Sequence, residues 1–101
     1  MREKCEKVYC VYILTNKLRG VLYTGVTGNL LKRIEEHREG VYSGFSRRYN
    51  LKKLVYYESM DRVEDAISLE KKIKKWRREW KINLIEAQNP LWEDLYEGLW
   101  S

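Results

Sequence analysis

Short apolar runs and longer stretches with helical spacing follow one another along this chain. The run at 8–14, VYCVYIL, is rich in β-branched and aromatic residues and apolar on both faces, so it predicts a central strand. VLYTG at 21–25 predicts a second strand, and TNKLRG at 15–20 is turn-forming. Because so short a connection cannot cross over, the two strands are predicted to form an antiparallel hairpin.

The next third of the chain predicts a helix, a loop and a third strand. Asn29 is a favourable N-cap for a helix over about 30–39, whose leucine and isoleucine residues form one stripe, and Gly40 is a typical residue to end it. The stretch 41–50 is polar, aromatic and basic, which favours a loop. LKKLVYYE at 51–58 predicts the third strand.

The C-terminal part is predicted to be helical. Asp61 and Glu64 resemble a capping box, and apolar residues near helical spacing follow them. These residues are Val63, Ala66, Ile67, Ile73, Trp76 and Trp80. The helix is expected to break near Arg77 into a second segment. The Asn-Pro pair at 89–90 predicts the start of a short final helix over 91–99.

This order, β-β-α-β-α-α, predicts an α+β fold in which helices pack on a small three-stranded antiparallel sheet. The 101 residues are the length of one domain, so we expect a single domain over 1–101 with a helical tail at 89–101. The longest apolar run has seven residues, which excludes a membrane-spanning helix and a secretion signal. We therefore expect a cytoplasmic location and no membrane partner.

The two cysteines and the one histidine limit covalent and metal chemistry. Cys5 and Cys10 would lie too far apart along one strand for an unstrained disulfide. With a single histidine in the chain, they cannot complete a four-ligand zinc site. A reduced protein is the simplest interpretation.

Positive charge is concentrated in the N-terminal part. The net charge is +5, and residues 1–57 hold 12 Lys/Arg against 5 Asp/Glu, whereas residues 58–101 hold 8 against 10. A dense basic run also lies at 71–81. Such a distribution is typical of proteins that bind polyanions, and solvated helix faces are an equally weighted alternative.

Five residues could form a site for phosphodiester cleavage. Tyr12 and Tyr23 lie on the predicted hairpin, Arg33 and His37 share one face of the following helix, and Glu70 lies on the long helix. Such a cleavage needs a base to activate water and positive charge to stabilise the transition state. One carboxylate suits a Mg²⁺ ion that keeps most of its waters.

The amino-acid sequences and the order of four segments resemble the GIY-YIG nuclease domain. The matching segments, over roughly 8–85, are CVYIL at 10–14, YTG at 23–25, NLLKRIEEH at 29–37 and LEKKIKKW at 69–76. The chain is most similar to the small stand-alone bacterial and archaeal members. Its segment NPLWEDL at 89–95 also resembles the tail of these proteins. The first motif differs from the family name, because Cys-Val-Tyr stands in place of Gly-Ile-Tyr.

The resemblance implies a role for each candidate residue. Tyr12 would activate water with support from Tyr23, Arg33 would stabilise the developing charge, and His37 would assist. Glu70 would be the only direct protein ligand of a Mg²⁺ (or Mn²⁺) cofactor. The two tyrosines, Arg33 and Glu70 are therefore expected to converge around a hydrated cation.

Each candidate also has a purely structural interpretation. The two tyrosines would be packed strand residues, and the histidine would be a satisfied polar side chain. The arginine would pair with Glu36 or Glu39, and Glu70 would pair with Lys74 on the same helix.

Further residues are candidates for nucleic-acid contact. They are Lys32, Arg47, Arg48 and Lys74, with Ser46 and Tyr49 in the same loop as the arginines. Trp76 and Trp80 lie within the basic run, but their helical spacing favours burial over stacking on bases. The resemblance also suggests a site asparagine, and the spacing does not decide between Asn83 and Asn89.

The sequence thus predicts a metal-dependent endonuclease acting on DNA, with structure-selective action in repair or recombination as one option. The alternative is a nucleic-acid-binding module with weak or no catalysis. A third hypothesis is protein interaction through the acidic tail at 86–101, although packing of this tail on the domain is preferred. Oligomeric state is not predicted.

Overall fold

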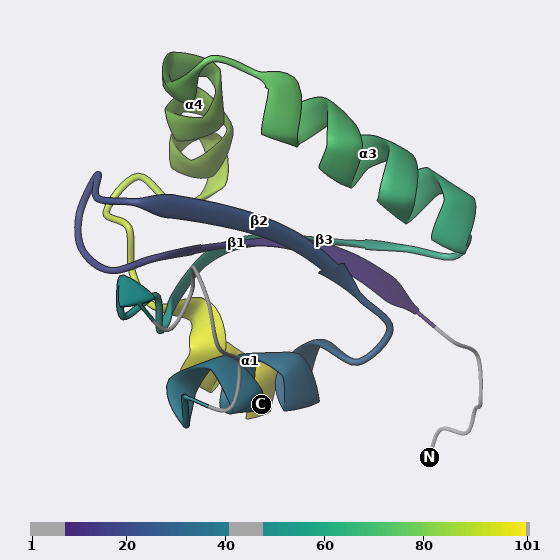
Figure 1. Ribbon diagram of the computed structural model, residues 1–101, viewed down its shortest axis with the longest axis horizontal. Helices are drawn as coiled ribbons and strands as arrows, with labels where there is room; N and C mark the ends of the chain where they lie inside the picture. The colour runs from purple at the N-terminus through teal and green to yellow at the C-terminus, as the bar shows by residue number, and fades with distance from the viewer. Residues whose placement is uncertain (1–7, 41–47, 101) are drawn as a thin grey trace.

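A three-stranded antiparallel sheet forms the centre of the computed structural model, which describes residues 8–40 and 48–100 (Figure 1). The strands are β1 (Tyr9–Thr15), β2 (Leu22–Thr27) and β3 (Lys53–Met60). Their order is β2-β1-β3, and both pairings are antiparallel. The predicted central position of the first strand is therefore confirmed.

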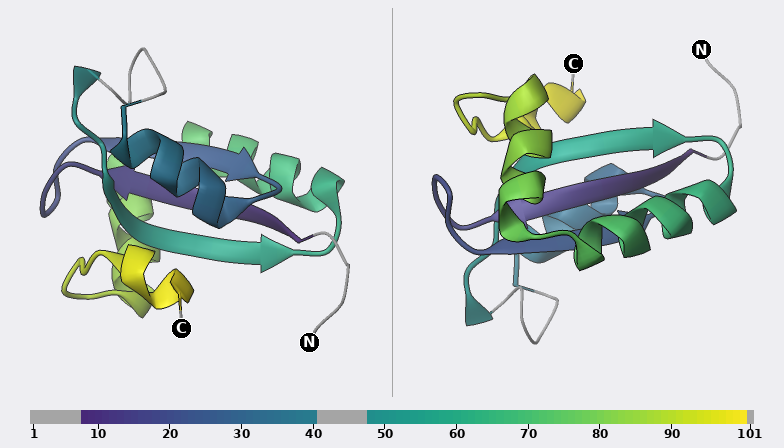
Figure 2. Two further views of the ribbon diagram at one scale, coloured as in Figure 1. Left: turned by 90° about the horizontal axis from the view of Figure 1, so that it is seen from below. Right: turned by 90° about the horizontal axis from the view of Figure 1, so that it is seen from above.

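Helices cover both faces of the sheet. The helix α1 (Leu30–Arg38) and the 3₁₀ helix η1 (Leu95–Trp100) lie on one face, which we call the α1 face. The helices α3 (Val63–Lys75) and α4 (Arg78–Gln88) lie on the other, the α3 face (Figures 1 and 2). The predicted α+β class is confirmed. Among residues 8–40 and 48–100, no helix combines the length and apolar character needed to cross a membrane.

Alternation along β1 sends successive side chains to opposite faces. Val11 and Ile13 are fully buried among the apolar residues of α3 and α4. Tyr12 and Leu14 are fully buried on the other side, together with Ile34 of α1. The central strand thus contributes to two separate cores.

The boundaries of α1 agree with the prediction. The Asn29 side chain accepts a hydrogen bond from the Lys32 backbone N–H, as an N-cap residue should. Gly40 follows the helix with a φ of 74°, a conformation that favours glycine.

The predicted capping box at the start of α3 is wrong. The helix begins at Val63 with Arg62 as N-cap, and Arg62 makes no side-chain cap hydrogen bond. Because the helix starts one residue later than the box requires, Asp61 is too early to cap it. The first turn instead carries Glu64 and Asp65, whose charges favour the positive end of the helix dipole.

The predicted break near Arg77 is confirmed, but the apolar stripe does not continue through it. Trp76 ends α3 with extended backbone, and α4 begins at Arg78. The side chain of Trp80 is 52% exposed, and in α4 the buried residue is Ile85. The break changes the direction of the chain, so the spacing measured along α3 no longer describes which side of α4 is buried.

The predicted final helix at 91–99 is also wrong at its start. Asn89 ends α4, and its buried amide donates hydrogen bonds to the carbonyls of Val55 and Glu93. Trp92 is fully buried, and its indole N–H donates to Glu86. The chain then turns into η1, so Asn89 joins the tail to β3 instead of starting a helix.

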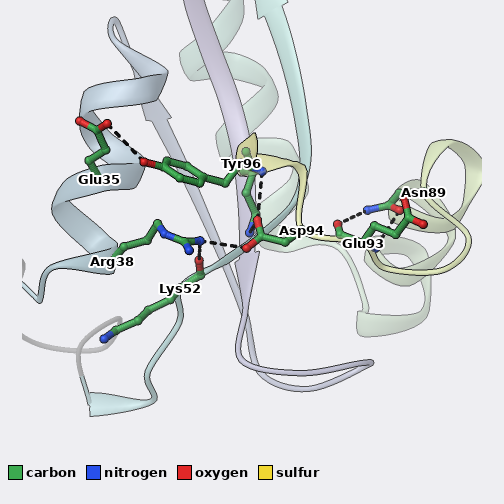
Figure 3. A network of polar contacts seen from close by, with 8 residues as sticks. Glu35, Arg38, Lys52, Asn89, Glu93, Asp94 and Tyr96 are labelled. Carbon is green, nitrogen blue, oxygen red and sulfur yellow. Dashed lines mark hydrogen bonds and ion pairs between the residues drawn. The ribbon is translucent and has the colours of Figure 1, made fainter. Parts of the chain in front are cut away.

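The last part of the acidic tail, from Asp94 onward, packs on the α1 face through its own polar contacts (Figure 3). Asp94 accepts hydrogen bonds from the backbone N–H of Leu54 and from Arg38, the latter at 2.9 Å. The Arg38 guanidinium lies 4.2 Å from the ring centroid of Tyr96, whose hydroxyl bonds Glu35. These contacts agree with the prediction that the tail packs on the domain, which the sequence favours over a role in protein interaction.

Candidate active site

Three aromatic rings from three different elements meet on the α1 face. Tyr12 comes from β1, Tyr23 from β2 and His37 from α1. The ring centroids lie 6.3 Å apart for the two tyrosines, 5.9 Å for Tyr12 and His37, and 5.6 Å for Tyr23 and His37. We call these three residues the ring cluster. The structure therefore brings together three of the five predicted site residues.

A buried hydrogen bond lies at the centre of the ring cluster. The Tyr12 hydroxyl is 3.2 Å from Nε2 of His37, and the tyrosine side chain is fully buried. Tyr23 is only partly buried, so it is the more accessible phenol of the two. Solvent and substrate can therefore reach Tyr23 more readily than Tyr12. The predicted roles, in which Tyr12 activates water and Tyr23 supports it, would need the opposite accessibility.

Gly25 makes room for this arrangement. It pairs with Tyr12 across the hairpin, and a Cβ atom at Gly25 would lie 2.5 Å from the tyrosine hydroxyl. Any larger residue would push the phenol away from His37. The sequence alone does not show this role, because the close approach depends on the strand register.

The environment of His37 favours the neutral imidazole. Burial lowers the pKa of His37 below its usual range, and the positive charge of Arg33 lowers this pKa further, while Glu36 opposes the shift. The ring is therefore uncharged near pH 7. A neutral imidazole has one nitrogen that can accept a hydrogen bond, and Tyr12 offers a hydroxyl donor.

Arg33 lies one helical turn before His37 and borders an open hollow. Its Nε is 3.6 Å from Glu36, which is the structural pairing that the sequence also suggested. Both side chains are about one-third exposed, so this pair is weak and leaves the guanidinium accessible to a phosphate. The hollow, of about 360 Å³, is lined by Thr27, Gly28, Asn29, Lys32 and Arg33.

Glu70 is not brought to the ring cluster by any contact within residues 8–40 and 48–100. It lies on α3 and therefore on the opposite face of the sheet from α1. The residue is only 9% exposed, and its Oε2 is 2.7 Å from Nζ of Lys74. The predicted i, i+4 pairing is thus formed, whereas the expected convergence of Glu70 with the two tyrosines and Arg33 is not seen among the described residues.

The donors available for a metal are few. In the part of the chain that the structure describes, no three His, Cys, Asp or Glu side chains are grouped closely enough to hold an ion. Glu70 alone fits the chemistry of a Mg²⁺ that keeps most of its waters and takes further oxygen ligands from phosphate. Glu70 lies across the sheet from the ring cluster, and the contacts among residues 8–40 and 48–100 do not place the two in one cleft.

The predicted nucleic-acid contacts are exposed where the structure describes them. Lys32, Arg48 and Lys74 are on the surface, and the Arg48 guanidinium is 5.8 Å from the ring centroid of Tyr49. Arg47 and Ser46 lie outside the described residues. Of the two candidate asparagines, Asn89 is buried and occupied by the tail, and Asn83 is exposed on α4.

Comparison with known proteins identifies the family. The family model described as the GIY-YIG catalytic domain matches residues 8–83. The chain therefore belongs to the GIY-YIG family of nuclease domains, as the resemblance of its motifs implied.

The relatives are small proteins of similar length. A UPF0213 protein of Clostridium perfringens is 41% identical over 87 residues, covering 86% of this chain and 91% of the relative. A UPF0213 protein of Syntrophus aciditrophicus is 40% identical over 81 residues, covering 79% and 91%. The solution NMR structure of a UPF0213 protein from Bacillus halodurans is 29% identical, with a TM-score of 0.56, covering 86% and 92%. The α+β fold is thus shared with a solved relative.

Proposed function

We propose that this protein is an endonuclease that hydrolyses phosphodiester bonds in DNA with the help of Mg²⁺ or Mn²⁺. The observation that carries the proposal is the buried hydrogen bond between Tyr12 and a neutral His37, formed beside Tyr23 and one turn from Arg33. A base, phenol hydroxyls and a guanidinium are the groups that phosphodiester hydrolysis requires. The family match supports the same class of reaction.

The residues of the ring cluster have distinct proposed roles. Tyr23 is accessible and orients the attacking water. Tyr12 is fully buried, and its hydroxyl holds the His37 imidazole in place. The neutral imidazole would accept the proton that the attacking water releases as its oxygen bonds to phosphorus. A phenol with a reference pKa of about 10 is a weak base near pH 7, so His37 is the better proton acceptor of the cluster.

Arg33 binds and stabilises the phosphate in this proposal. Its planar guanidinium can donate two hydrogen bonds to phosphate oxygens and offset the charge of the transition state. Lys32 and Arg33 both border the hollow beside α1, so a phosphate there meets two positive side chains. The weak pair with Glu36 is readily exchanged for a phosphate.

Glu70 is the proposed ligand of the metal. Bound Mg²⁺ would offset phosphate charge and acidify a coordinated water. The carboxylate would have to exchange Lys74 for the ion, because Lys74 Nζ is 2.7 Å from Oε2. The basic surface would hold the DNA backbone with little reading of bases, which favours branched or flapped DNA of the kind found in repair and recombination.

Cleavage assays on a substrate panel test the proposal. Plasmid, single-stranded, branched and flapped DNA are incubated with purified protein and either Mg²⁺ or Mn²⁺. We expect cleavage by the wild type and a loss of about 10²–10³-fold in rate for Arg33→Ala, because one stabilising donor is removed from the transition state. Arg62→Ala is the matched control, since Arg62 is an exposed arginine with similar acidic partners on the α3 face.

The metal is tested separately with Glu70→Ala. We expect this variant to lose the response of the cleavage rate to Mg²⁺. Cleavage of no substrate by the wild type would overturn the nuclease proposal, and equal cleavage by Glu70→Ala would overturn only the role of Glu70.

A nucleic-acid-binding module with weak or no catalysis is the second candidate. The pairing of Glu70 with Lys74 on the far face of the sheet favours it, because the pair holds this carboxylate away from the ring cluster. Binding that falls steeply with salt, needs no divalent metal and is accompanied by no cleavage would identify this function.

A further inference from the structure

An exposed tryptophan stands at the junction of α3 and α4. Trp80 is 52% exposed, and its ring centroid lies 6.1 Å from that of Trp76 at an interplanar angle of 75°. Trp76 is partly buried against the core of the α3 face, so it anchors the second ring. The arrangement holds a large, rigid aromatic surface in contact with solvent. Packing in the core therefore does not explain why a tryptophan is present at this position.

The two rings border a shallow hollow on α4. The hollow has a volume of about 340 Å³, and Trp76, Trp80, Asn83 and Leu84 line it. Its walls are mostly aromatic and aliphatic, and Asn83 adds an amide that can donate and accept hydrogen bonds. A flat, weakly polar ligand such as a nucleobase matches these walls.

The surroundings of the hollow are strongly basic. Residues 71–81 contain seven Lys/Arg and one glutamate. Four of the lysines have no acidic partner within ion-pair distance among residues 8–40 and 48–100, namely Lys71, Lys72, Lys75 and Lys81. An aromatic platform flanked by unneutralised lysines is complementary to a base between two phosphates, and an acidic peptide would use the charges but not the flat ring.

We propose that Trp80 is a stacking platform for an unpaired base and that the neighbouring lysines hold the adjoining phosphates. Bases in a duplex already stack on one another, so only single-stranded nucleic acid can offer a face to the ring. This inference rests on the proposed function and narrows its substrate class to nucleic acid with a single-stranded stretch.

The position of the platform suits a strand that also reaches the ring cluster. In the right-hand view of Figure 2, the α3–α4 junction lies over the edge of the sheet formed by β2. Tyr23 of the ring cluster comes from this edge strand. A strand held at Trp80 would pass around the β2 edge to reach the α1 face.

Binding measured without divalent metal tests the platform separately from catalysis. Fluorescence anisotropy with labelled oligothymidylate, oligouridylate and a duplex of equal length is recorded in EDTA at one salt concentration. We expect Trp80→Ala to weaken binding of oligothymidylate about tenfold, as the loss of one stacked base predicts, and to change duplex binding less than about twofold. Trp80→Phe should restore most of the affinity, and Leu91→Ala, which removes another exposed apolar side chain, should change nothing.

The lysines are tested by the double substitution Lys72→Gln and Lys75→Gln. We expect it to weaken all three probes and to reduce the salt dependence of binding, because it removes phosphate contacts. Equal effects of Trp80→Ala on oligothymidylate and duplex, or no effect on either, would overturn the platform. Oligouridylate separates DNA from RNA preference, and neither result depends on the cleavage assays with Arg33→Ala.

Discussion

The two faces of the sheet use the same strands for different purposes. On the α3 face, Val11 and Ile13 of β1 close a wholly apolar core with Ile73. On the α1 face, the next residue of the same strand is Tyr12, which lies against Tyr23 and His37. Alternation at a period of two residues therefore separates the α3-face core from the layer that holds the ring cluster within a single seven-residue strand.

The difference shows how a small domain can hold a polar cluster without opening its core. The Tyr12 hydroxyl is buried but has a hydrogen-bond partner in His37, so burial leaves no unsatisfied group. Gly25 supplies the space that a side chain would fill. Each face buries its own apolar cluster, and the cluster on the α3 face holds β1 from behind while the ring cluster lies on the α1 face.

The largest expected effect on stability is on the α3 face. Ile73→Ala removes a fully buried side chain and should lower the free energy of unfolding by about 2–5 kcal/mol. Ile67→Ala is the control on the same helix, and because Ile67 is 38% exposed it should cost about 1 kcal/mol or less. Urea denaturation measures both. Equal costs would contradict the assignment of Ile73 to the buried core of the α3 face.

A substitution on the α1 face should lower the free energy of unfolding by less and should disturb the ring cluster specifically. Gly25→Ala places a methyl group 2.5 Å from the Tyr12 hydroxyl, so we expect a cost of about 1–3 kcal/mol and loss of the hydrogen bond to His37. Gly98→Ala is the control, because a Cβ there meets nothing within 4 Å. Thermal unfolding and the His37 ring resonances in NMR spectra would report both changes, and an unshifted imidazole would contradict the role of Gly25.

How much the sequence could predict follows from whether each feature depends on local or distant contacts. The Asn29 cap and the Gly40 ending are local, and both were predictable. Asn89 was misread because its partners include Val55, which is 34 residues away. The same limit applies to the candidate site: spacing placed Arg33 and His37 on one helical face, but it could not tell on which face of the sheet Glu70 would lie.

The smallest expected effect is the pH dependence that His37 gives to stability. Its pKa is lowered in the folded state, so the unfolded chain binds the proton more readily, and stability should fall as the pH drops through about 6.5. His37→Gln should flatten this dependence between about pH 7 and pH 5. Urea midpoints across that range measure it, and an identical slope in the variant would mean that the imidazole is not held neutral by the fold.

The central claim is that the ring cluster on the α1 face takes part in the proposed cleavage, whereas the tyrosine that β1 turns to the α3 face does not. Single-turnover cleavage of DNA by Tyr23→Phe and by Tyr9→Phe tests it most directly, because each variant removes one hydroxyl oxygen from a partly buried tyrosine, on opposite faces of the sheet. The account predicts a rate lower by about 10²-fold or more for Tyr23→Phe and an unchanged rate for Tyr9→Phe. Equal rates for the two variants would contradict it.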